Sequence, residues 1–177
     1  MAVTVSWREY NSTVTPGNSL GSVATNINFG NVDSVDLTPA SYPIAAGSNS
    51  YAKYLRIRFS GSYTQISNLK IYKSNGNYVT GETVQFSGSV VKSASAPTTT
   101  DAGWPVIDVS LPGSANVCIR DLTTHTIPYS GQPASSPGYY SGSAYDTDTI
   151  GFQLKTTAST PAGAVNQKTI SLTYDRQ

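Results

Sequence analysis

Short runs of alternating apolar and polar residues recur along the chain, and such alternation predicts β-strands with one buried face. Residues 2–7 alternate in this way, and residues 54–59 place apolar side chains on one face with Arg56 and Arg58 on the other. Further apolar or alternating runs occupy 20–29, 66–72, 84–91, 106–111, 117–122, 150–156 and 169–174. The pattern predicts about eight strands.

Glycine, proline and asparagine separate these runs and mark the expected turns. Gly61-Ser62 is expected to turn the chain after the 54–59 run. Asn75-Gly76 follows the next run and is a strong signal for a β-hairpin. Residues 160–163 read Thr-Pro-Ala-Gly and lie between the last two runs, which are therefore candidates for pairing as a closing hairpin.

Helical signals are nearly absent. No stretch of about 11 residues carries apolar side chains at helical spacing, and Thr, Val, Ser and Tyr dominate the sequence. A chain of 177 residues suits one domain with its own core. We therefore expect residues 1–177 to form a single all-β domain, an antiparallel β-sandwich of Ig-like or jelly-roll type with negligible helix.

Two long segments are predicted to be loops. Residues 30–50 contain Pro39, Pro43 and Gly47 among small polar residues. Residues 127–149 contain three prolines, three glycines and four tyrosines. Loops of this length in one domain are usually functional, so the second segment is the strongest candidate for partner contact.

Charged residues make up 12% of the chain, about half the usual share. The 11 basic and 10 acidic residues leave a formal net charge of +1 and form no basic patch, which argues against nucleic-acid binding. The N-terminal residues do not read as a signal peptide, and no run is long and apolar enough to span a membrane. We therefore expect synthesis in a cytoplasm and no membrane partner.

The residues that usually carry catalysis are sparse. Cys118 lies in an apolar run and is most simply a buried small side chain, and His125 has no serine-nucleophile motif to serve. Glu9 and Glu82 show no spacing that predicts a carboxylate pair. We expect no enzymatic activity and no catalytic residue.

Metal and nucleotide sites are also not expected. The sequence Asp146-Thr147-Asp148 has the look of a hard-cation loop, but it lacks the glycine and distal glutamate of an EF-hand and is better explained as a polar turn. Residues 70–78 alternate Lys and Tyr in a way that favours base stacking only weakly. No phosphate-binding glycine loop precedes a helix, so no cofactor is expected.

The tyrosines of the 127–149 segment are the candidate contact residues. Tyr129, Tyr139, Tyr140 and Tyr145 stand among Ser, Gly and Pro, as in recognition loops. Their rings would stack on a sugar or be buried by a protein partner. They would alternatively fold back onto their own domain.

Two parts of the chain resemble a known class of protein when taken together. The first is the stretch at 54–73 with Ser-Asn-Leu-Lys-Ile-Tyr-Lys at 67–73, followed by Gly76 and the strand at 84–86. The second is the strand at 150–154, the Pro-Ala-Gly turn at 161–163 and the strand at 170–174. About a third of the chain thereby resembles small β-sandwich structural proteins of tailed bacteriophages, in particular capsid decoration or cement proteins.

This resemblance implies a structural virion protein that binds the outer surface of a capsid and stabilises or decorates it through protein–protein contacts. The implied partners are the major capsid protein and other virion proteins, with the chain forming a homo-oligomer on the particle. The N-terminal run with Trp7 and Tyr10 would join residues 127–149 as a contact segment. The alternative is a carbohydrate- or receptor-binding module of a phage tail or fibre.

Overall fold

Strand β3 (Lys53–Asn75) organises the fold, because β1, β5, β6 and β7 all pair with it. The structure is a computed structural model. It describes residues 2–12, 21–88, 90, 92, 99–104, 106–107, 140–163 and 167–177, with the side chains of 67, 68, 70 and 140–145 outside the description. The remaining strands are β1 (Val3–Glu9), β2 (Ser22–Val23), β4 (Thr83–Ser87), β5 (Tyr140–Asp146), β6 (Ile150–Lys155) and β7 (Thr169–Arg176).

The seven described strands form one antiparallel hydrogen-bonded sheet, with the order β2-β1-β3-β6-β4 and with β5 and β7 also paired to β3. The expectation of an all-β, antiparallel fold is confirmed. Within the described part of the chain, the helical content is one 3-10 turn, η1 (Pro39–Ser41). No helix among these residues is long and apolar enough to cross a membrane.

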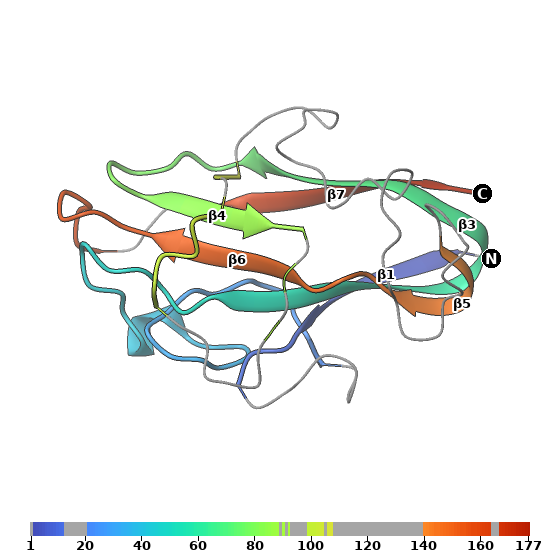
Figure 1. Cartoon of the computed structure of the whole chain (residues 1–177), viewed down its shortest axis with the longest axis horizontal. Coiled ribbons are helices and arrows are strands. Elements are labelled where there is room, and N and C mark those ends of the chain that lie inside the picture. Colours follow the sequence, from blue (N-terminus) through green and yellow to red (C-terminus); the bar gives the residue numbers. More distant parts are fainter. Residues whose placement is uncertain are drawn as a thin grey trace.

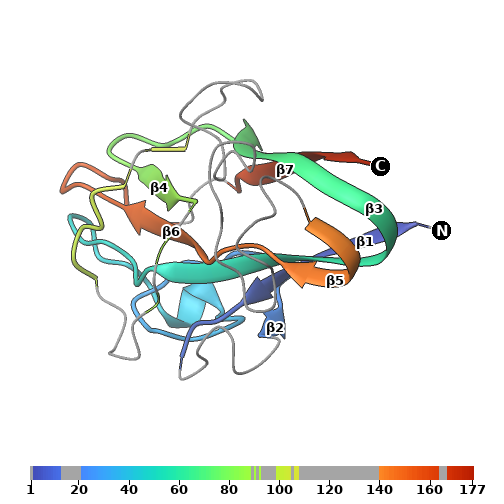
Figure 2. The ribbon, with the colours of Figure 1, turned by 45° about the vertical axis from the view of Figure 1, so that its right-hand side comes forward.

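The long strand β3 is bent, so its two halves lie in different parts of the molecule. Its first half runs beside β1, and its second half returns beside β7 (Figures 1 and 2). Gly61 lies at the bend with a φ of 103°, and a Cβ there would approach the Ala2 carbonyl oxygen to 2.5 Å. Glycine suits this position because it tolerates positive φ and close backbone approach. Gly61-Ser62 therefore bends a continuous strand, and the predicted turn at these residues was wrong.

The core lies on the inner face of the bent sheet. Leu55, Ile57 and Phe59 of β3 are buried there, in contact with β6 and β4 through a cluster that includes Phe152 and Phe86. The rings of Phe86 and Phe152 have their centroids 5.2 Å apart. Full burial of each such side chain contributes about 1.5–3 kcal/mol relative to exposure, so this cluster is the main source of stability among the described residues.

Strand β6 is buried on both faces. Its apolar residues face the core, and its Gln153 is buried on the other side under residues 99–104. The Gln153 amide donates to the carbonyls of Ser50 (2.9 Å) and Thr100 (3.0 Å), and its oxygen accepts from the Ala102 N–H (2.8 Å). A buried amide needs such partners, and Gln153 thereby fixes the covering segment to the sheet.

Several sequence expectations require correction. The runs at 150–156 and 169–174 do not pair with each other, because β6 pairs with β3 and β4 while β7 pairs with the second half of β3. Asn75-Gly76 ends β3 without a tight hairpin, since the next strand, β4, pairs with β6. Residues 140–146 of the expected 127–149 loop form strand β5. The expected loop at 30–50 is confirmed; it contains the 3-10 turn η1 and a turn closed by the hydrogen bond from the Ser48 N–H to the Ala45 carbonyl.

Candidate functional site

A cavity of about 1190 Å³ is a candidate binding site in the described structure. It lies between the 24–46 segment and strands β1, β4, β6 and β7. Aromatic rings line it, namely Trp7, Phe29, Tyr42 and Phe152. Ligand pockets usually measure about 300–1,000 Å³ and combine apolar walls with a few polar groups, so the cavity has room for a small organic molecule or a short glycan.

The carboxylate and the ammonium that line this cavity are bound to each other. Lys168 Nζ lies 2.6 Å from both carboxylate oxygens of Glu82, and Glu82 also accepts a hydrogen bond from the Val79 N–H at 3.0 Å. The Glu82 side chain has no exposed surface, and that of Lys168 is 9% exposed. Both oxygens of the Glu82 carboxylate are thus engaged by neighbouring groups of the chain.

A tyrosine ring links this ion pair to the end of β3. Lys73 Nζ lies 5.0 Å and Lys168 Nζ 5.5 Å from the centroid of the Tyr78 ring. The Tyr78 hydroxyl donates to the Ile107 carbonyl, and Lys73 donates to the Gly76 carbonyl at 2.8 Å. Both ammonium groups are attracted to the face of the ring. The Lys-Tyr pattern of residues 70–78 thus serves internal packing at Lys73 and Tyr78.

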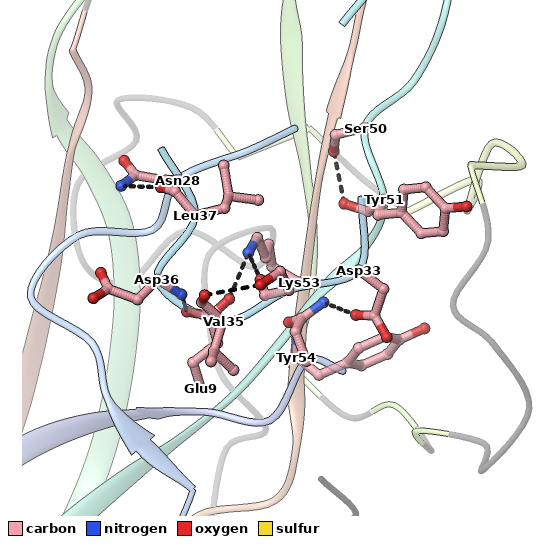
Figure 3. Close-up of polar contacts among 12 residues, drawn as sticks. Glu9, Asn28, Asp33, Val35, Asp36, Leu37, Ser50, Tyr51, Lys53 and Tyr54 are labelled. Carbon is pink, nitrogen blue, oxygen red and sulfur yellow. Dashed lines mark hydrogen bonds and ion pairs between the residues drawn. The ribbon is translucent and has the colours of Figure 1, made fainter. Parts of the chain in front are cut away.

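A second ion pair is fully enclosed at the junction of β1 and β3. Lys53 Nζ lies 2.5 Å from Glu9 Oε1, with 1% and 3% of the two side chains exposed. Figure 3 shows both side chains beneath the segment that carries Val35 and Asp36. Asn11 lies nearby and donates to Asp33 at 2.7 Å and to the Ala52 carbonyl at 2.8 Å. The sequence analysis did not identify this group.

Other charges of the described chain are also largely engaged. Arg58 binds both carboxylate oxygens of Asp146 at 3.1 and 3.2 Å. Asp101 is exposed and accepts from Lys155, from the Gly103 N–H and from Gln85; these hydrogen bonds, that of Lys155 foremost, lower the pKa of Asp101 to about 2. Among described side chains, the charged residues that are well exposed are Asp36, Asp101, Asp175 and Arg176.

The predicted contact residues fall into three groups. Tyr10 is 1% exposed, with Arg56 5.7 Å from its ring centroid; burial, and secondarily Asp146, raise the pKa of its hydroxyl, although Arg56 opposes this. Tyr10 is therefore an interior residue, and its expected role as a surface contact is wrong. Trp7 is partly buried, packs against the core and lines the cavity.

The tyrosines of the 127–149 segment are only partly described. The backbone of Tyr140 pairs with Ile66, and that of Tyr145 pairs with Phe59, so both belong to β5 on the edge of β3. Tyr129 and Tyr139 lie outside the described residues, as do Cys118 and His125. The backbone of Tyr140 and Tyr145 is thus paired with β3, with register shifts between the two positions.

Residues 147–149 are an irregular connection between β5 and β6, which both pair antiparallel with β3. The Thr147 hydroxyl accepts from the Ile57 N–H at 3.0 Å and donates to the Asp148 carbonyl at 2.9 Å. The described residues include no group of three or more His, Cys, Asp or Glu side chains placed to hold a metal ion.

No protein-family model, curated protein or solved structure matches the chain. The case for function therefore rests on the chain's own residues.

Proposed function

We propose that this chain is a structural protein of a bacteriophage particle. It binds the outer surface of the capsid through protein–protein contacts and stabilises or decorates the shell, without catalysing a reaction. The major capsid protein and other virion proteins are its partners, and it forms a homo-oligomer on the particle.

The supporting observation is that the chain has few charged side chains and buries several of them. Glu9, Lys53, Lys73 and Glu82 are buried. The described exterior is correspondingly rich in Ser, Thr and Asn. A surface with little charge and a net charge near zero favours association with neighbouring molecules, and the cores of protein interfaces are depleted in charge.

The 127–149 segment is the proposed centre of attachment. Within it, β5 pairs with β3 and so orders the backbone of Tyr140 and Tyr145. Pre-ordered backbone reduces the entropy lost on binding. A contact of about 1,600 Å² is the usual size of a specific interface, and repetition over a shell adds avidity.

The test is the composition of purified particles. Particles of the source virus are banded on a density gradient, washed in about 1 M salt, where the Debye length falls to about 3 Å, and analysed by mass spectrometry. We expect the chain to remain on the particles in fixed ratio to the major capsid protein, because the contacts are largely uncharged. Its absence from unwashed particles would overturn the proposal.

The cavity favours a second function, that of a carbohydrate-binding module of a tail or fibre. Aromatic faces and amide or hydroxyl groups, such as Asn26 and Thr38, are the groups that bind sugars, and both kinds line it. Tyr42 is 40% exposed and lines the cavity.

Glycan arrays followed by titration calorimetry test this second function. Saturable binding that is lost in Tyr42→Ala and retained in Val23→Ala, an exposed residue that does not line the cavity, would favour the glycan role. Absence of binding across the array would leave the capsid role as the better account.

A further inference from the structure

In the enclosed Glu9–Lys53 pair, the ammonium and the carboxylate each also form a hydrogen bond with the backbone. Glu9 is the last residue of β1 and lies opposite Leu55 of β3 in the antiparallel register. Lys53 is two residues before Leu55, so it lies diagonally across from Glu9 on the same face of the sheet. Both side chains are therefore directed into the interior (Figure 3).

Lys53 and Glu9 each have one further hydrogen-bond partner, supplied by the backbone of residues 34–36. Lys53 Nζ donates to Glu9 Oε1 at 2.5 Å and to the Ser34 carbonyl at 2.6 Å. Glu9 Oε2 accepts from the Asp36 N–H at 3.2 Å. The two oxygens of the carboxylate thus have different partners, one the ammonium and the other an amide N–H.

An amide formed from the same atoms would keep both backbone partners. Its N–H would donate to Ser34, and its C=O, derived from Oε2, would accept from Asp36. It would also remove two charges from a site where 1% and 3% of the side chains are exposed, and enclosed charges carry a large desolvation penalty even when they are paired.

We propose that Lys53 and Glu9 are joined by an isopeptide bond that forms after the chain folds. Lys53 first transfers a proton to Glu9 Oε1, which leaves a neutral amine and a carboxylic acid. The Nζ lone pair then attacks Cδ, and Oε2 takes the negative charge, held by the Asp36 N–H. Nζ passes a second proton to Oε1, which leaves as water, and the C=O re-forms at Oε2 while Nζ keeps one hydrogen.

Proximity lowers the activation barrier of this condensation. Groups held in reactive geometry behave as if present at concentrations on the order of 10⁵–10⁸ M, and the enclosed site has little water to reverse the step. The product would link β1 to the start of β3 covalently and so staple the two strands at the centre of the sheet.

Two other Lys–carboxylate pairs differ from this one in their contacts and in their exposure to water. Lys168 lies 2.6 Å from both oxygens of Glu82 rather than close to one of them, and its side chain is 9% exposed, against 1% for Lys53. The Lys155–Asp101 pair is in contact with solvent, with 38% and 40% of the two side chains accessible to water. Among the ion pairs of the described residues, the amide is therefore expected at Lys53 and Glu9.

Tryptic peptide mapping tests the proposal directly. The sequence has no Lys or Arg between Glu9 and Lys53, and the next cleavage site is Arg56. A blocked Lys53 side chain prevents cleavage there, so the linked protein yields a peptide spanning residues 9–56 that lacks the mass of one water molecule. Fragmentation places the link at Lys53 and Glu9, and hydroxylamine treatment leaves it intact, unlike a cyclic imide of Asp.

Two variants complete the experiment. Lys155→Met is the matched control and retains the dehydrated 9–56 peptide. Lys53→Met cannot form the link, and its intact mass equals that expected from its sequence. If the folded wild-type chain shows full cleavage after Lys53 and no loss of water, the proposal is overturned, whether or not Lys53→Met folds.

Discussion

Removing the ammonium from the Glu82–Lys168 pair is expected to destabilise the fold strongly. In Lys168→Met the aliphatic part of the side chain is approximately retained, but Glu82 loses both of its 2.6 Å contacts and keeps the hydrogen bond from the Val79 N–H. The Glu82 carboxylate has no exposed surface through which water could replace the lysine. The variant therefore leaves a buried charge without its partner.

The size of the effect follows from this burial. Breaking a buried ion pair by removing one member costs about 3–5 kcal/mol. For a domain of 150–250 residues, each kcal/mol lowers the melting temperature by about 2–4 °C, so Lys168→Met should melt about 6–20 °C below the wild type. Lys155→Met is the matched control, because it breaks an exposed pair that contributes little to stability.

Urea unfolding followed by fluorescence of Trp7 and Trp104 gives the free energy of unfolding for each variant. The double variant Glu82→Gln/Lys168→Met should regain part of the loss, since a neutral amide still accepts from the Val79 N–H and leaves no unpaired charge. If Lys168→Met and Lys155→Met are destabilised equally, the argument that burial decides the value of these pairs is refuted.

Three further outcomes are expected. Gly76→Ala should lower the free energy of unfolding by about 1–3 kcal/mol more than Gly103→Ala, because both glycines have positive φ but only at Gly76 would a Cβ meet a backbone carbonyl oxygen, at 2.3 Å; equal losses in urea unfolding would contradict this. The Asp101 carboxyl should titrate with a pKa of about 2 by NMR, since the hydrogen bond from Lys155 favours its ionised form. This carboxylate therefore contributes to stability above the ordinary pKa of an aspartate, and the contribution is lost as the pH falls through about 2. A titration midpoint near the ordinary pKa of an aspartate would contradict this. Tyr139→Ala with Tyr140→Ala should weaken attachment to the particle by about 2–4 kcal/mol without changing the melting temperature; unchanged occupancy together with a lower melting temperature would assign these rings to the core.

Local alternation was sufficient to predict several of the strands. The runs at 2–7, 150–156 and 169–174 correspond to β1, β6 and β7. The continuity of β3 was missed because Gly61 has the same local signal at a bend as at a turn, and the outcome depends on the distant Ala2 carbonyl that packs against it. Pairing partners were likewise not predictable, since they depend on contacts far apart in sequence.

The enclosed ion pair was partly predictable. Lys53 is in phase with Leu55, Ile57 and Phe59, so the alternation that predicted the strand also places this lysine on the core face. A buried lysine requires a partner, but the identity of Glu9 follows only from the register between β1 and β3. Glu82 and Lys168 are 86 residues apart and carry no local signal at all.

A reconstruction of the virus particle by electron cryomicroscopy at side-chain resolution tests the central proposal most directly. The proposal predicts density for this chain in repeated copies on the outer surface of the capsid, with residues 127–149 against the major capsid protein and few charged side chains in the contact. A shell whose outer density is fully accounted for by other proteins, or this chain located at the tip of a tail fibre with its cavity open to solvent, would contradict the capsid role.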